Sequence, residues 1–163
     1  MIAEVPSGAG FDAVLWQVSV TEISTDCPFS DLPGLGRQFA VIEGDGVELV
    51  SVDEITGASS RQLVERRSRP YAFPGDWRTT CRLLRGPVRV LNVMTRRGRF
   101  GATVEIVTSD RAFQLEKAAG EVLVAIDLHS LDAWLLDRET AERQTVVPSP
   151  GIRNVALVTI RSA

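Results

Sequence analysis

GPVRVLNVMTRRG, residues Gly86–Gly98, is a run rich in β-branched residues enclosed between two turn signals. Successive side chains of a strand point to opposite faces of the sheet, so Val88, Val90, Asn92 and Met94 would share one face. The Gly-Pro and Arg-Gly pairs at the two ends are typical of turns. The stretch therefore predicts a β-strand that carries one amide on an otherwise apolar row.

Short strand patterns separated by similar turns recur along the whole chain. Many short strands with Pro-Gly and Gly-Pro punctuation are typical of a β-sandwich or a β-barrel. We expect strands at Leu15–Ile23, Gln38–Ile42, Val47–Val52, Val88–Thr95, Ala102–Thr108, Glu121–Leu128, Ala133–Asp137 and Val155–Ile160. The sequence therefore predicts an all-β fold.

Four connecting stretches carry more local signals. Glu43–Gly46 (EGDG) predicts a hairpin, because glycine accepts the positive φ of a tight turn. Asp110–Ala119 reads either as a helix with an N-cap or as a loop with a strand fragment. Asp137–Arg143 reads as a helical turn or a polar hairpin tip. Thr56–Arg69 has the composition of a loop.

Length and composition narrow the class of protein. The chain has 163 residues, two cysteines and a net charge of −3, which indicates one domain without a disulfide framework. A nucleic-acid-binding protein would need a basic stripe, and a membrane span would need about 18 apolar residues. Neither pattern is present, nor is a secretory signal. We expect a cytoplasmic protein that binds neither nucleic acid nor membrane.

The residue inventory also argues against several kinds of active site. The sequence contains one histidine, His129, so one chain cannot supply two histidines and a carboxylate to a metal. It has no phosphate-binding loop, no dinucleotide fingerprint and no nucleophile elbow. Cys81 lies in a strand-like stretch, where a buried structural thiol is expected rather than a nucleophile. We therefore expect no metal and no cofactor.

Two polar side chains are the main candidates for ligand binding. Arg37 opens a strand after a tight Pro-Gly turn, where its guanidinium either reaches an anionic ligand or binds its own loop carbonyls or Asp31. Asn92, if its row faces the interior, needs a partner because an unsatisfied buried polar group costs roughly 1–3 kcal/mol. A neighbouring loop or a ligand would supply that partner.

The stretch Tyr71–Asp76 (YAFPGD) and the strand around Asn92 supply further candidates. Phe73 and Met94 would form an apolar wall, since methionine fills irregular gaps well. Asp76 is either a turn acceptor or a polar contact for the ligand.

Three blocks taken together, PFSDLPGLGRQFAVIEGDGVEL, PYAFPGDW and LLRGPVRVLNVMTRRG, resemble the HutD/Ves family in order and spacing. The similarity runs from about Trp16 to Gly98. The resemblance implies a bicupin, in which two cupin-like (RmlC-type) β-barrel halves form a single domain over residues 1–163. It also implies a bacterial cytoplasmic protein.

The same resemblance implies a function without an established reaction. One branch of the family is linked to histidine utilisation and to sensing of a small acidic metabolite such as formylglutamate; the other is linked to cold and stress response. This chain departs from the family pattern twice. The usual Trp-x-Asn-Gly-Gly segment is expected to be missing at the N-terminus, and Val90 stands where the family strand commonly has an acid.

We therefore expect a metal-free cavity that binds a small anionic metabolite and regulates a pathway of the histidine-utilisation type. The expected ligand contacts are Arg37, Phe73, Asp76, Asn92 and Met94. Two alternatives stay open: a metal-independent enzyme that uses carboxylates such as Asp76 or Glu105, and a stress-related interaction module without a ligand. A homodimer formed through a sheet edge is compatible with each of them.

Overall fold

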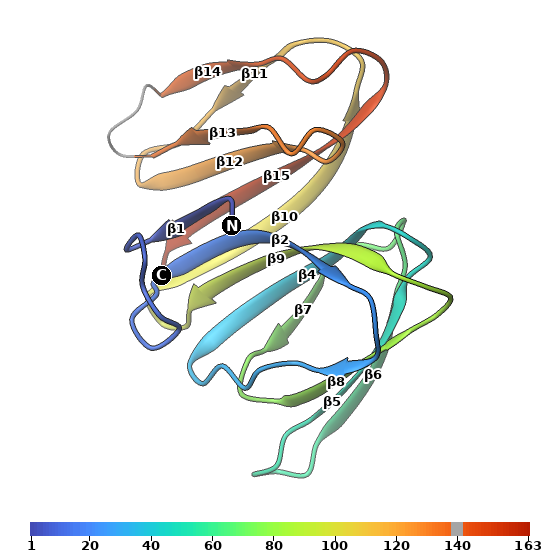
Figure 1. Cartoon of the computed structure of the whole chain (residues 1–163). Helices are drawn as coiled ribbons and strands as arrows, with labels where there is room; N and C mark the ends of the chain where they lie inside the picture. Colours follow the sequence, from blue (N-terminus) through green and yellow to red (C-terminus); the bar gives the residue numbers. More distant parts are fainter. Residues whose placement is uncertain (138–141) are drawn as a thin grey trace. The chain divides into compact units, whose positions relative to one another are not determined.

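The structure, a computed structural model, describes residues 1–137 and 142–163. The chain divides into two compact units, Met1–Arg99 and Phe100–Ala163. The described residues form fifteen β-strands and no helix (Figure 1). None of the described segments has the length and hydropathy that a membrane-crossing helix requires. The all-β class expected from the sequence is confirmed.

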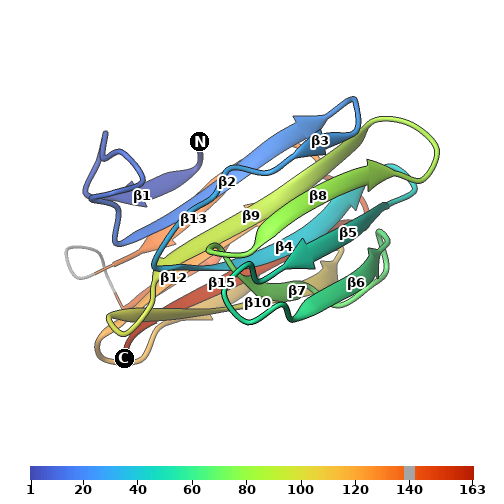
Figure 2. The ribbon, with the colours of Figure 1, turned by 90° about the horizontal axis from the view of Figure 1, so that it is seen from below.

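The first unit contains two antiparallel sheets. The five-stranded sheet has the order β1 (Ala3–Val5), β2 (Trp16–Ile23), β9 (Val88–Arg96), β4 (Leu35–Glu43) and β7 (Tyr71–Pro74). The four-stranded sheet has the order β3 (Cys27–Pro28), β8 (Arg78–Leu83), β5 (Val47–Val52) and β6 (Ser59–Val64). Strand β9 lies between β2 and β4 (Figure 2), which explains why it is buried along most of its length.

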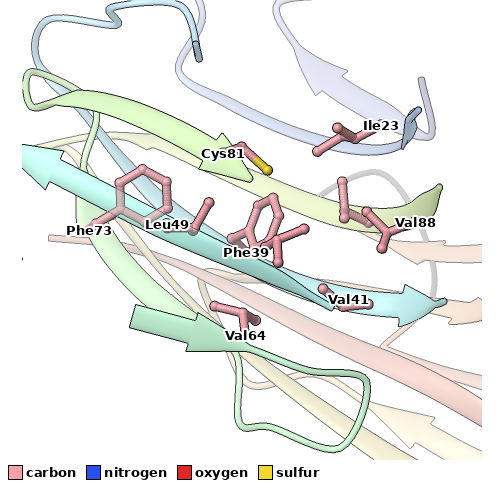
Figure 3. Close-up of a cluster of buried hydrophobic side chains, with 10 residues drawn as sticks. Ile23, Phe39, Val41, Leu49, Val64, Phe73, Cys81 and Val88 are labelled. Carbon is pink, nitrogen blue, oxygen red and sulfur yellow. The ribbon is translucent and has the colours of Figure 1, made fainter. Parts of the chain in front are cut away.

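Side chains from both sheets of this unit form an apolar cluster (Figure 3). Phe39 of β4, Leu49 of β5 and Val64 of β6 are each at most 1% exposed. Burying side chains of this size contributes about 1.5–3 kcal/mol each. The apolar cluster consists of Ile23, Phe39, Val41, Val47, Leu49, Val64, Phe73, Cys81, Val88 and Val90.

The hairpin predicted at Glu43–Gly46 is wrong. Strand β4 pairs with β7 and β9, whereas β5 pairs with β6 and β8 of the other sheet, so this turn carries the chain between sheets. Its glycines are still required. Gly44 and Gly46 have φ angles of +93° and +135°, and a Cβ would lie 2.7 Å from the Pro87 carbonyl oxygen and 2.8 Å from that of Val64, respectively.

Two other expectations need adjustment. The loop predicted over Thr56–Arg69 is wrong in its middle, where β6 pairs with β5. Only Val64 of β6 is buried, so this edge strand lacks the apolar alternation that identifies a strand. In Asp110–Ala119 the strand fragment is present as β11 (Phe113–Glu116), and the helix alternative is wrong. The turn expected at Asp137–Arg143 falls largely outside the described residues.

The second unit has a four-stranded sheet and a two-stranded one. The larger sheet has the order β10 (Phe100–Ser109), β15 (Arg153–Ser162), β12 (Glu121–Asp127) and β13 (Ala133–Leu136). Strand β11 pairs with β14 (Arg143–Val146). The unit has its own buried cluster of Leu115, Leu123, Ala125, Leu136, Val146 and Val155. The single domain over residues 1–163 stays a prediction.

Candidate functional site

A pocket of about 420 Å³ lies within the first unit. Residues of β2, of the segment that follows it through β3, of β4 and of β9 line it. Arg37, Asn92 and Met94, three of the five site residues predicted from the sequence, are among the lining residues. We call Arg37 and Asn92 the pocket floor, because both are only 7% exposed.

The register of β4 and β9 brings the two floor residues together. Arg37 is opposite Met94, and Phe39 is opposite Asn92, so all four side chains share one face of the sheet. The Nη2 of Arg37 donates a hydrogen bond to Oδ1 of Asn92 over 3.2 Å. The face that is apolar at Phe39 thus becomes polar at Asn92, directly opposite on β9, and at Arg37, two residues away on β4.

Aromatic rings hold the Arg37 guanidinium in position. Its central carbon lies 4.7 Å from the ring centroid of Phe29 and 5.0 Å from that of Phe73. Such contacts attract a cation toward the ring face and leave the edge of the guanidinium free to donate hydrogen bonds. Phe73 belongs to the apolar cluster and contacts Arg37 without itself lining the pocket.

Arg37 is a buried cation without a counter-charge among the residues that the structure describes. No carboxylate of the described residues forms an ion pair with it, and its Nε is buried without a hydrogen-bond partner. Burial lowers the pKa of Arg37 to about 10, so the group remains charged at neutral pH. A buried charge that is left uncompensated is costly, and an anion in the pocket would remove that cost.

The hydrogen bond between the floor residues also decides what Asn92 presents. Arginine can only donate, so the amide of Asn92 must turn its oxygen toward Arg37 and keep its two N–H donors for another partner. Within the described part of the chain, the Asn92 side chain forms no other hydrogen bond than the one it accepts from Arg37. The floor therefore offers donors from both residues, which suits a carboxylate.

The loop-binding role considered for Arg37 is filled by Arg96 instead. The guanidinium of Arg96 donates to the main-chain oxygens of Phe11, Asp12, Val14 and Pro33 over 2.6–3.2 Å. It thereby joins the segment before β2 to the loop before β4. Sequence reasoning missed this residue, because an arginine at the end of a strand carries no signal of what its side chain will meet.

Asp76 serves the turn before β4. Its carboxylate accepts a hydrogen bond from the backbone N–H of Gly34 over 3.0 Å and forms an ion pair with Arg97. It does not line the pocket. Met94 does line the pocket, and it also packs with Leu32 and Leu35.

The other groups considered for chemistry lie elsewhere or are inert. Burial, with smaller effects from Cys27 and Asp26, raises the pKa of the Cys81 thiol to about 12, so it is a poor nucleophile. Glu105 is on β10 of the second unit. His129 follows β12 and donates its backbone N–H to Asp127. Within residues 1–137 and 142–163, no three histidine, cysteine or acidic side chains gather to hold a metal.

Comparison with known proteins gives relatives over most of the chain. The HutD family model matches residues 1–146. An uncharacterised 21.2 kDa protein in the hutC 3′ region of Pseudomonas putida is 29% identical over 82% of this chain and 66% of its own length. Protein Ves of Citrobacter koseri is 32% identical over 74% of this chain and 58% of its own. The chain thus spans less than two thirds of these relatives.

Two solved structures share the fold. A conserved protein of unknown function from Pseudomonas aeruginosa has a TM-score of 0.73 and 21% identity, over 98% of this chain and 90% of that one. HutD from Pseudomonas fluorescens, described in a formate condition, has a TM-score of 0.64 and 24% identity, over 96% and 84%. Because the HutD family model covers residues 1–146, this chain belongs to the HutD family.

Proposed function

We propose that this protein binds a small carboxylate-bearing metabolite over Arg37 and Asn92 and acts by sensing or regulating a metabolic pathway. The observation that carries the proposal is Arg37, an arginine that is 7% exposed, has no carboxylate partner among the described residues and borders a pocket of about 420 Å³. Pockets of roughly 300–1,000 Å³ are typical of small-molecule sites.

A carboxylate in the pocket would supply what the floor lacks. It would give Arg37 a counter-charge, and it would accept from the guanidinium and from the Asn92 amide at the same time. Hydrogen bonds to charged groups contribute roughly 1.5–3 kcal/mol each, more than neutral ones. The rings of Phe29 and Phe73 already fix the orientation of the guanidinium, so little of this energy is lost in ordering it.

The chemistry of the floor favours binding over catalysis. A general acid or base must exchange a proton near neutral pH, whereas Arg37 stays charged and the amide of Asn92 does not titrate. The carboxylates considered for catalysis, Asp76 and Glu105, are not among the pocket-lining residues. We therefore infer a binding protein, which responds to its ligand without converting it chemically.

The relatives suggest the pathway. One is described by its position in the hutC 3′ region, and a solved HutD is described in a formate condition, formate being the smallest carboxylate. We propose that the ligand belongs to histidine utilisation or to a pathway that yields similar acids. A cytoplasmic setting and a homodimer stay predictions that this pocket does not require.

Isothermal titration calorimetry tests the proposal on the whole chain. The ligands are formate, longer monocarboxylates, small dicarboxylates and formylated amino acids. Arg37→Ala should abolish binding, and Asn92→Ala should weaken it about tenfold, the effect of losing one good hydrogen bond. Arg89→Ala is the matched control, because Arg89 lies on β9, the strand of Asn92, but forms an ion pair with Glu43 at the surface.

Two results would overturn the proposal. One is the absence of binding by every acid on the panel, and the other is equal affinity in the wild-type protein and Arg37→Ala. Circular dichroism of each variant checks that the sheet signal is intact, so that lost binding is not lost folding.

A further inference from the structure

We infer that the pocket selects a monocarboxylate with an apolar body, and that Phe11 is the residue that recognises this body. The inference rests on the proposed function, because it assumes that a carboxylate sits on the pocket floor. The inferred ligand differs from the small acidic metabolite that the family resemblance implies, since formylglutamate carries two carboxylates.

The charges of the lining limit the ligand to one carboxylate. Arg37 is the cation among the lining residues that the structure describes. Glu22 also borders the pocket, but the alternation of β2 turns its side chain away from the face of Thr21 and Ile23, and the register sets it opposite Arg89. A second carboxylate would lose its hydration in the pocket without gaining a cationic partner, and such desolvation is unfavourable.

The size and surface of the pocket call for an apolar body. One water molecule occupies about 30 Å³, so a carboxylate group alone would leave most of about 420 Å³ unfilled. Phe11, Ile23, Phe29, Leu32 and Met94 supply apolar lining, and apart from Glu22 and the two floor residues the polar lining consists of the Cys27 thiol and of hydroxyls such as that of Ser30. This surface suits methylene or ring carbons.

Hydrogen bonds hold the main chain around Phe11, whereas the residue itself is about half exposed. Arg96 donates hydrogen bonds to the main-chain oxygens of Phe11 and Asp12. The backbone N–H groups of Ala13 and Val14 both donate to the main-chain oxygen of Gly10, with N–O distances of 3.0 Å. The side chain is nevertheless 47% exposed, although it is large and apolar. A ligand body would cover this ring, and the anchored main chain keeps it in place to be covered.

A matched set of acids tests the inference on the full-length protein by calorimetry. Hexanoate and adipate have the same number of carbons and differ by one carboxylate, and formate provides the head group alone. Each buried methylene raises affinity roughly fourfold. We expect hexanoate to bind at least about tenfold more tightly than both formate and adipate.

The variant Phe11→Ala should lower hexanoate affinity about fivefold and leave formate affinity unchanged, because only the longer acid reaches the ring. Ile55→Ala, which removes an even more exposed apolar side chain away from the pocket, is the control and should change neither. Since Phe11 is half exposed, its removal should leave the folding midpoint nearly unchanged.

The outcomes separate this inference from the proposed function. If adipate or formylglutamate binds as tightly as hexanoate, or if Phe11→Ala leaves hexanoate affinity unchanged, the inference is wrong while Arg37-dependent carboxylate binding stands. If none of the acids binds, both fail.

Discussion

Arg37 and Arg96 both lie in the first unit, but their side chains have different hydrogen-bond partners. Arg96 meets four main-chain oxygens, so its donors are engaged by the fold itself. Arg37 contacts one amide oxygen and two ring faces, and its Nε has no hydrogen-bond partner within residues 1–137 and 142–163. The half-buried Arg96 is therefore structural, because main-chain oxygens satisfy its donors, whereas the buried Arg37 is a candidate for ligand binding.

The largest effect is expected from Arg96→Ala, which tests the structural side of the comparison. Its loss leaves four carbonyl oxygens without their donor and frees two loops, so the free energy of unfolding should fall by about 3 kcal/mol or more. Urea denaturation measures this loss. Arg99→Ala, an exposed arginine of the following turn, should cost under about 0.5 kcal/mol. Equal costs for both variants would remove the structural role of Arg96.

The next largest effect is expected on ligand binding, when a substitution gives Arg37 a counter-charge within the protein. Asn92→Asp places a carboxylate where the amide oxygen now accepts from Arg37. Carboxylate affinity should fall about 100-fold, because the ligand must then displace or tolerate a like charge. Calorimetry measures the affinity, and Asn154→Asp in the second unit gives the same change of charge away from the pocket. Unchanged affinity in Asn92→Asp would show that the ligand binds elsewhere.

Arg37→Met sharpens the comparison by separating function from stability. Methionine keeps apolar contacts with Phe29 and Phe73 and removes a charge that has no counter-charge in the described part of the chain. Replacing a buried, poorly compensated charge by an apolar side chain of similar length is often neutral or stabilising by about 1–2 kcal/mol. We expect an unfolding midpoint at or above that of the wild-type protein, with no carboxylate binding. A clear loss of stability would mean that Arg37 holds the fold together, as Arg96 does.

The smallest effect concerns Asp127, a buried charge that the protein satisfies by itself. Burial would raise its pKa, but hydrogen bonds from the backbone N–H groups of Ser149, His129 and Ser130 outweigh burial and lower it. Its stabilisation is therefore present above the unfolded-state pKa of about 3.9 and is lost as the pH falls through the lower, folded-state pKa.

Urea unfolding of the wild-type protein and Asp127→Asn at neutral pH and at about pH 3 measures this dependence. The variant should be less stable at neutral pH and should lose less stability in acid. Parallel pH profiles would indicate that Asp127 contributes nothing to the acid sensitivity.

The strands could be predicted from the sequence because their signals are local. Val47–Val52 has the bounds of β5, and the expected strand at Leu15–Ile23 differs from β2 by one residue. The partner of a strand is not a local property. The Asp-Gly signal at Glu43–Gly46 correctly indicates a tight turn, but only packing decides that the turn joins two sheets rather than two neighbours.

The candidate site could be predicted in part for the same reason. The alternation of β9 indicated that Asn92 and Met94 share a face, and both line the pocket. Phe11 and Phe29 lie far from Asn92 in sequence, and Arg96, although it lies on the same strand as Asn92, carries no local pattern that indicates its contacts. Their roles depend on long-range contacts, and so does the difference that, among the described residues, main-chain oxygens accept from the Arg96 side chain whereas an amide side chain accepts from that of Arg37.

The most direct test of the central claim follows the arginine Nε–H signals by ¹⁵N NMR during a carboxylate titration. Burial protects the Nε–H of Arg37 from solvent, so its signal should be observable, and Arg37→Met assigns it. We expect this signal to shift saturably as the acid binds, while the signal of the Arg96 Nε–H, which donates to the Val14 main-chain oxygen, does not shift. A bound carboxylate that leaves the Arg37 signal unmoved would contradict the claim that this guanidinium receives the ligand.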